Sequence, residues 1–141
     1  MKRFFDTSVL VATVILQHPR HPASLEIYSQ SEKGTGFCAA HSLAETYATV
    51  TALPGNLRMS GEQALLFLED VRRRLTVVSP NEGDYFAAIS AAIGEDIVGG
   101  TIYDALIGRC AVKSGADAIY TWNVADFRRL GPEIAKRVRT P

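Results

Sequence analysis

Short apolar runs alternate with longer amphipathic segments along the whole chain. Five runs predict strands, at 3–5, 36–39, 75–78, 118–121 and 137–140. Helical spacing of apolar residues, with glycine and proline stops, predicts helices at 7–16, 22–33, 42–53, 60–74, 80–93, 101–113 and 126–130. Alternating strands and helices are typical of an α/β fold in which helices cover both faces of a parallel sheet.

The size of the chain sets the number of domains. At 141 residues, of which 47% are hydrophobic, we expect a single domain over 1–141 with a substantial core. No internal repeat, linker or low-complexity segment interrupts it. The composition excludes a disordered or a disulfide-stapled chain.

Charge limits how the protein can bind nucleic acid. The 15 Lys and Arg residues balance the 15 Asp and Glu residues, so the formal net charge is zero. Proteins that hold duplex DNA over a whole surface usually carry a basic excess. Phosphate contacts must therefore come from local basic patches, although each patch is also typical of a solvated helix end: Arg72-Arg73-Arg74, Arg128-Arg129, and Lys136-Arg137 with Arg139.

Neither a membrane segment nor a metal-thiolate site is expected. No run approaches the roughly 20 apolar residues that cross a bilayer, and Asp6 interrupts the N-terminal apolar stretch. We therefore expect a cytoplasmic protein with no membrane partner, in which Cys38 and Cys110 are buried free thiols. The three histidines lack the neighbours of a metal cluster and are expected at the surface or at caps.

Four acids follow strands or occupy the first turns of predicted helices. Asp6 closes the first strand, and the others each come three residues after a Ser, Thr or Asn, namely Glu45, Asp104 and Asp126. Taken singly, each acid is well explained as a helix cap or a partner of the helix dipole.

Taken together, the acids predict a metal site. Carboxyl ends of parallel strands share one edge of a sheet, and sites form outside that edge. Converging carboxylates repel one another, and Mg²⁺ or Mn²⁺ would relieve that repulsion and activate water at a phosphoryl centre. Ser8 and Thr121 could hold a carboxylate or a metal-bound water in place, and Asn123 could position a phosphate or cap a helix.

The same residues resemble those of the PIN-domain family, and most closely the VapC-type toxin ribonucleases of bacterial toxin–antitoxin systems. The resemblance spans nearly the full chain and rests on four motifs, Asp6-Thr7-Ser8, Ser42 to Tyr47, Tyr103 to Ile107, and Thr121 to Phe127. One departure is Asn123, which occupies a position that is acidic in some relatives, so the number of metals stays open.

The resemblance implies a three-layer α/β/α sandwich, Mg²⁺- or Mn²⁺-dependent cleavage of structured RNA, homodimerisation, and inhibition by a cognate antitoxin. It also implies an acidic site built from Asp6, Glu45, Asp104 and Asp126. We expect RNA to be contacted at the border of this site by Arg72, Arg73, Arg74, Arg128 and Arg129, with Lys136 and Arg137 as weaker candidates. Tyr103 and Trp122 flank the acids and could stack a base, although packing is their commoner role.

Other interpretations stay open at this point. A PIN-like module without catalysis would bind only RNA or a protein, and a metal-dependent phosphatase or DNA nuclease could use the same acids. A phosphoacceptor receiver domain is disfavoured, because no middle strand ends in Asp and no late strand ends in Lys. Apolar faces at 22–33 and 60–74 favour a two-fold dimer.

Overall fold

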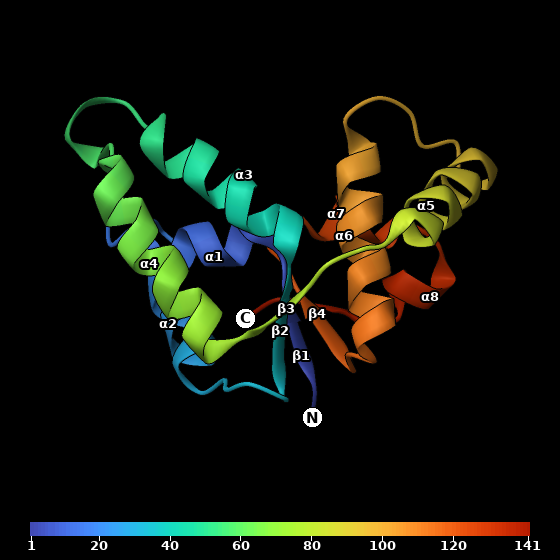
Figure 1. The fold of residues 1–141 in the computed structure, drawn as a ribbon, viewed down its shortest axis with the longest axis horizontal. Helices are drawn as coiled ribbons and strands as arrows, with labels where there is room; N and C mark the ends of the chain where they lie inside the picture. Colours follow the sequence, from blue (N-terminus) through green and yellow to red (C-terminus); the bar gives the residue numbers. More distant parts are fainter.

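Five parallel strands form the centre of the molecule. A computed structural model describes all 141 residues (Figure 1). The strands are β1 (Arg3–Phe5), β2 (Gly36–Ala39), β3 (Thr76–Val78), β4 (Ala118–Tyr120) and β5 (Val138–Arg139). They lie in the order β3-β2-β1-β4-β5, and every neighbouring pair is parallel. The predicted parallel sheet is therefore confirmed, including its short last strand.

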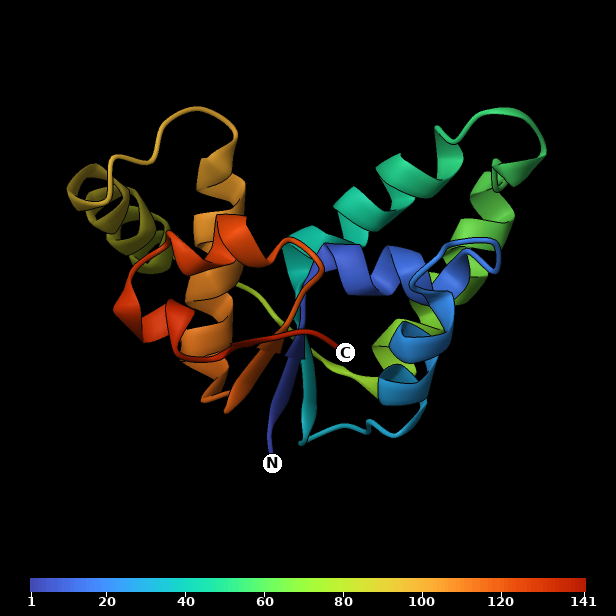
Figure 2. The same cartoon turned by 180° about the vertical axis from the view of Figure 1, so that it is seen from behind.

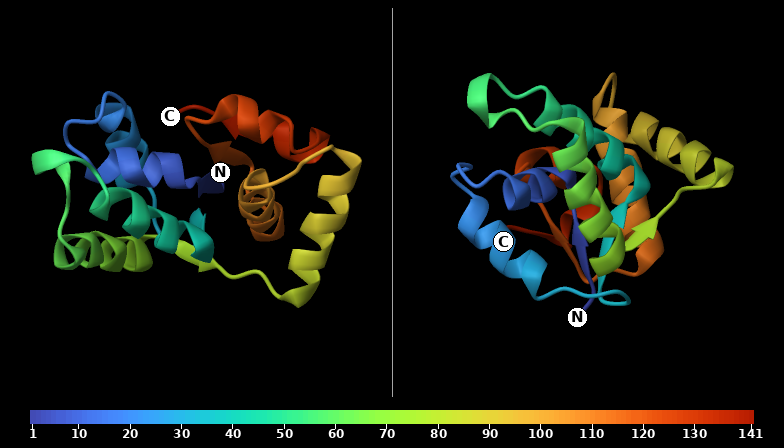
Figure 3. Two further views of the ribbon diagram at one scale, coloured as in Figure 1. Left: turned by 90° about the horizontal axis from the view of Figure 1, so that it is seen from above. Right: turned by 60° about the vertical axis from the view of Figure 1, so that its left-hand side comes forward.

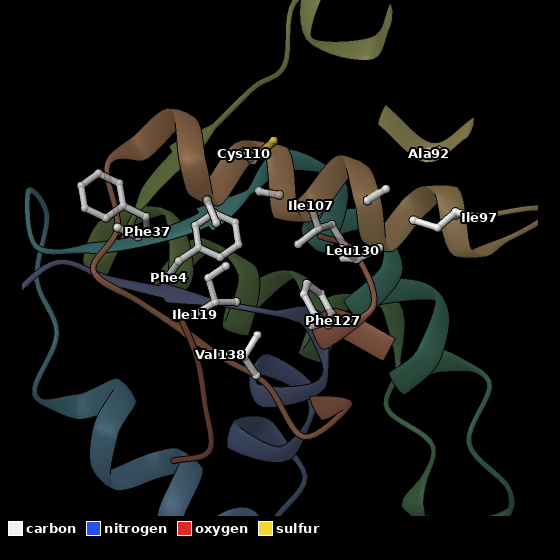
Figure 4. Packing of buried hydrophobic residues seen from close by; sticks show 14 residues of the cluster. Phe4, Phe37, Ala92, Ile97, Ile107, Cys110, Ile119, Phe127, Leu130 and Val138 are labelled. Carbon is white, nitrogen blue, oxygen red and sulfur yellow. The ribbon is translucent and has the colours of Figure 1, made fainter. Parts of the chain in front are cut away.

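Alternate residues of each strand face opposite layers of helices. Phe4 pairs in register with Phe37 and Ile119, and all three belong to the larger apolar cluster (Figure 4). Phe5 and Cys38, one residue further along, belong to the second cluster on the other face. The period-two pattern of strands thus fills both layers.

Four helices pack on each side of the sheet, giving three layers. One side holds α1 (Thr7–Val14), α2 (His21–Ser29), α3 (Ala40–Thr51) and α4 (Gly61–Arg74), with a 3-10 turn, η1 (Gly55–Leu57). The other side holds α5 (Glu82–Gly94), α6 (Thr101–Ser114), α7 (Val124–Arg128) and α8 (Pro132–Ala135) (Figure 2). Seen from above, α3 and α6 lie on opposite sides of the end of the sheet (Figure 3). The α3–α4 pair and the α5–α6 pair therefore form two arms that diverge from the strands (Figure 1).

The observed helices differ most from the predicted ones where the sequence has weak start or stop signals. Helix α2 ends at Ser29, four residues before the predicted end, and α8 and η1 were not predicted. Helix α3 begins at Ala40, not Ser42, because β2 leads directly into it through the extended backbone of Ala39. Ser42 therefore caps nothing, and its buried hydroxyl is free to contact another element. No helix of the protein is both long and apolar enough to span a bilayer.

Candidate active site

The sheet register brings the first acid between two neighbouring strands. Phe5 pairs with Cys38 and Tyr120, so the next residues, Asp6, Ala39 and Thr121, lie level at the carboxyl edge of the sheet. Helices α1, α3 and α7 start at this edge directly after their strands. A pocket of about 340 Å³ opens there, and it is lined by Asp6, Thr7, Ser8, Val11, His18, Glu45, Thr49, Asp104, Trp122 and Asn123.

Asp6 is held by hydroxyl groups on one of its two oxygens. Its side chain is almost fully buried, and Oδ2 accepts hydrogen bonds from the Ser8 hydroxyl and the Thr121 hydroxyl, each at 2.8 Å. The Ser8 backbone N–H also donates to Oδ2, at 3.4 Å. Burial raises the pKa of Asp6, and these hydrogen bonds oppose that shift in part. Of the two roles open to Ser8 and Thr121, the structure shows the one in which they hold the carboxylate.

Glu45 reaches the pocket from the second turn of α3. Thr7 Oγ1 lies 2.7 Å from Glu45 Oε1, to which it donates, and 2.9 Å from Ser42 Oγ. His41 Nε2 lies 3.7 Å from Glu45 Oε2, one helical turn earlier. The alternative interpretation of Ser42 and Glu45 as a helix cap is therefore excluded, because both side chains contact Thr7 of α1 instead of the start of their own helix.

The effect of neighbouring acids on a pKa is clearest at Asp104. Its pKa is raised to about 6, first by burial of its carboxyl group. The negative charges of Asp6, Glu45 and Asp126 then raise this pKa further, in that order. The nearby Arg129 guanidinium opposes them. The three other predicted acids therefore all act on Asp104, although Asp126 lies outside the lining of the pocket. Asp104 forms no side-chain cap on α6.

The aromatic residues beside the acids are engaged in packing. Trp122 Nε1 donates to Ser24 Oγ at 2.9 Å, and the Trp122 backbone N–H donates to Ser8 Oγ at 3.0 Å. The Tyr103 ring stacks on His41, with centroids 5.3 Å apart and planes 11° from parallel. This pair joins the first turns of α3 and α6 across the base of the two arms. Asn123 lies in the pocket lining and makes no side-chain cap on α7.

The predicted basic residues divide between the two edges of the sheet. Arg128 is the last residue of α7, which starts at the carboxyl edge, and Arg129 follows it, close enough to Asp104 to lower its pKa. Arg72 and Arg73 lie in the last turn of α4, which leads into the first residue of β3. They are therefore at the opposite, amino edge of the sheet, and the expectation that they border the acidic site is wrong. Lys136 and Arg137 precede β5 and also lie toward the amino edge.

The side chains of the pocket have the chemistry of ligands for a hydrated divalent cation. As the side chains stand, no three His, Cys, Asp or Glu residues are close enough to ligate one ion directly. The donors nevertheless suit a hard cation that keeps several waters, because three carboxylates line the pocket together with hydroxyl and amide oxygens. The hydrogen bonds that Asp6 accepts from Ser8 and Thr121 all fall on Oδ2, and none of them takes up Oδ1. The residues therefore fit Mg²⁺ or Mn²⁺ bound partly through water.

Two residues that contact Glu45 were not predicted from the sequence. Thr7 is the hydroxyl that holds Glu45, and its place directly after the first acid was the only signal. His41 lies four residues before Glu45 on one helix, a spacing that brings side chains together and marks it as a neighbour. Cys38 and Cys110 are buried free thiols as expected, and burial raises their pKa values to about 12 and about 11.

Comparison with known proteins decides the family. The model of the PIN domain matches residues 3–131. The chain belongs to the PIN-domain family. This PIN domain is 30% identical to ribonuclease VapC27 of Mycobacterium tuberculosis over 112 residues, which cover 79% of the chain and 78% of that protein. It is also 30% identical to ribonuclease VapC40 of the same species, with 79% of each protein covered.

Solved structures agree on the fold. The crystal structure of VapC20 from M. tuberculosis, described as a toxin that cleaves the sarcin–ricin loop, superposes with a TM-score of 0.71 over 86% of this chain and 90% of its own, at 16% identity. VapBC2 from Rickettsia felis, bound to a DNA fragment from its promoter, gives a TM-score of 0.67 at 19% identity, with 99% and 98% covered. The three-layer α/β/α fold and the likeness to VapC-type PIN domains are thus confirmed.

Proposed function

We propose that the protein is a divalent-metal-dependent endoribonuclease and the toxin of a toxin–antitoxin pair. The observation that carries the proposal is the shared pocket of Asp6, Glu45 and Asp104, in which Asp104 has its pKa raised to about 6 by burial and by its acidic neighbours. Such a group of carboxylates is costly unless a cation binds there. The curated relatives, both called ribonuclease VapC, support hydrolysis of RNA as the reaction.

The acids and hydroxyls of the pocket have different roles in the proposed reaction. Asp6, Glu45 and Asp104 hold the cation, directly or through water, and Asp126 adds negative charge at the border. Ser8 and Thr121 fix the orientation of Asp6 through Oδ2. When bound, Mg²⁺ or Mn²⁺ supplies neutralisation of phosphoryl charge and lowers the pKa of a bound water.

The proposed substrate is a loop of structured RNA. VapC20, a neighbour in fold, is described as cleaving the sarcin–ricin loop, which supports this class of substrate. Unstacked loops also expose single-stranded backbone to an open pocket, whereas a duplex would not enter it. The exact loop is left to the cleavage assay.

The proposed partners are an antitoxin and a second copy of the chain. A neighbour in fold is the VapBC2 complex, which supports an antitoxin. The apolar side chains that suit a homodimer lie on α5 and the loop after it, where Phe86, Ile93 and Val98 are 66%, 76% and 79% exposed. Of the two faces favoured from sequence, α2 exposes only Leu25 among its large apolar residues, whereas α4 exposes Leu65 and Leu66, at 56% and 72%. A Phe86→Glu variant that sediments as a monomer, beside a dimeric parent, would support this face.

An RNA-cleavage assay tests the function. The purified protein is incubated with ribosomal RNA in Mg²⁺, and again with EDTA, beside an Asp6→Asn variant. Asn can keep its carbonyl oxygen at the Oδ2 position, so the three hydrogen bonds and the fold survive. We expect discrete cleavage only with Mg²⁺ and the native chain, with a loss of at least about 100-fold in the variant. Equal cleavage by Asp6→Asn, or none by the native chain, contradicts the proposal.

A further inference from the structure

Arg20 is a basic residue beside the active site that sequence patterns did not single out. Its exposed guanidinium lies over the Trp122 ring, with 4.6 Å between Cζ and the ring centroid. Arg20 takes part in none of the ion pairs of the structure, unlike Arg72 and Arg73 of α4. It is therefore a cation held in place without a carboxylate partner.

A chain of contacts joins this guanidinium to the acidic pocket. Trp122 lines the pocket, and the Nε1–H of the indole beneath the guanidinium is anchored on the fully buried Ser24. The Trp122 backbone N–H donates to Ser8 Oγ, and that hydroxyl donates to Asp6. The Arg20 guanidinium is thus placed at the border of the site by residues in direct contact.

The loop that carries Arg20 is also fixed. The Arg20 backbone N–H donates to His18 Nδ1 at 3.0 Å, and His18 lines the same pocket. The guanidinium lies over the Trp122 ring and donates no hydrogen bond within the protein, so its N–H groups stay free for an acceptor. A planar guanidinium that stacks through its face can bind a phosphate through its edge at the same time.

A cation at the position of Arg20 would offset the repulsion between the acidic pocket and RNA. Three acids line the pocket and Asp126 lies near it, so an RNA strand meets negative charge as it approaches. Arg72 and Arg73 lie at the other edge of the sheet and cannot offset this repulsion near the pocket. We propose that Arg20, seated on Trp122, binds a backbone phosphate of the RNA next to the scissile one. This inference rests on the proposed ribonuclease function.

The test uses the lone tryptophan of the chain as its reporter. The Asp6→Asn protein, which binds without cutting, is titrated with an oligouridylate of about twelve nucleotides, and Trp122 fluorescence is followed at several salt concentrations. Arg20→Met keeps the apolar stem on the indole and removes the charge, and Arg20→Lys keeps the charge without the planar face. Arg72→Ala is the control that removes an arginine at the opposite edge.

We expect oligouridylate to change the Trp122 emission. Arg20→Met is expected to weaken binding about 5- to 10-fold and to reduce the salt slope by about 0.7, the value of one phosphate contact to a single strand. Arg20→Lys should keep the slope with weaker binding, and Arg72→Ala should match the parent. In the active protein, Arg20→Met should raise KM and leave kcat near the native value.

Two results would overturn the inference. If Arg20→Met binds with the affinity and salt slope of the parent while the native chain cuts RNA, Arg20 has no phosphate contact and the proposed function stands. If the native chain neither cuts RNA nor binds oligouridylate, both proposals fall. An unchanged emission spectrum of the free Arg20→Met protein shows that Trp122 has kept its place, so a loss of affinity is not a loss of structure.

Discussion

At the amino edge of the sheet the arginines of α4 have acidic neighbours, whereas at the carboxyl edge the acids face one another. Arg72 lies 2.8 Å from Glu69, and Arg73 and Arg74 lie 3.8 and 3.7 Å from Asp70. At the other edge, burial and three acidic neighbours raise the pKa of Asp104 to about 6. The chain is neutral as a whole, so this contrast reflects where the charges are placed and not how many there are.

Charged residues have different roles at the two edges of the sheet: those at the amino edge stabilise the fold, and those at the carboxyl edge form the proposed binding site. Asp70 also accepts a hydrogen bond from the buried Tyr28 hydroxyl at 2.7 Å, and this contact helps to join α2 to α4. Charges at that edge therefore stabilise the folded chain. Charges at the carboxyl edge destabilise it in the absence of a cation, which is typical of a site organised for binding. Removing a charge should then have opposite effects on stability at the two edges.

The largest effect is expected for Asp104→Asn. This change removes a proposed metal ligand, and we expect RNA cleavage to fall at least about 100-fold. In EDTA at pH 7.5 the variant should nevertheless be more stable than the parent, because it no longer holds a charge among other acids. Cleavage rates and urea unfolding check the two parts. A variant that is inactive and also less stable than the parent would contradict the proposed repulsion.

The stability gain should depend on pH. The folded chain keeps the Asp104 proton at pH values where the unfolded chain has released it, between 3.8 and about 6. The free energy of unfolding therefore falls as the pH rises through this window, and the cost is complete above it. The shift of about 2 units corresponds to about 3 kcal/mol, which solvent screening of a half-exposed group reduces to about 1–2 kcal/mol. The advantage of Asp104→Asn should accordingly vanish near pH 4.

A smaller effect is expected for Thr7→Val. Valine keeps the shape of the side chain and removes the hydroxyl that donates to Glu45 at 2.7 Å. The Glu45 carboxylate then loses its orientation, and we expect cleavage to fall about 10-fold. Thr7→Ser retains the hydroxyl and is the matched control, with activity near that of the native chain. Equal activity of the valine and serine variants would show that Glu45 needs no such support.

The smallest effect on activity is expected for Asp70→Asn, the isosteric counterpart of Asp104→Asn at the amino edge. It removes the charge that faces Arg73 and Arg74 and weakens the hydrogen bond from Tyr28. We expect a loss of about 1 kcal/mol in the free energy of unfolding, with RNA cleavage unchanged. Urea unfolding and the cleavage assay check both. A gain in stability of Asp70→Asn would contradict the claim that charges at the amino edge stabilise the folded chain.

The sequence predicted the parallel sheet and the meeting of the acids because both depend on local signals. Asp6 follows a short apolar strand, and strand order then determines its neighbours. The partner of Glu45 and the position of Arg72 were harder to predict, since each depends on where a helix starts and how far it runs. Ser42 has the sequence of a cap, yet β2 continues directly into α3 and turns its hydroxyl toward Thr7. The cation–π contact of Arg20 with Trp122 joins positions about a hundred residues apart in the sequence. Such a contact cannot be predicted from the local spacing of residues.

Calorimetric titration with Mn²⁺ tests the central claim most directly, namely that the acids at the carboxyl edge together form a cation site. The native chain and Asp6→Asn are titrated under identical conditions, with Asp70→Asn as a control that removes an acid from the other edge. The account predicts saturable binding to the native chain and to Asp70→Asn, and its loss in Asp6→Asn. Binding of equal strength to Asp6→Asn, or no binding to the native chain, would contradict it.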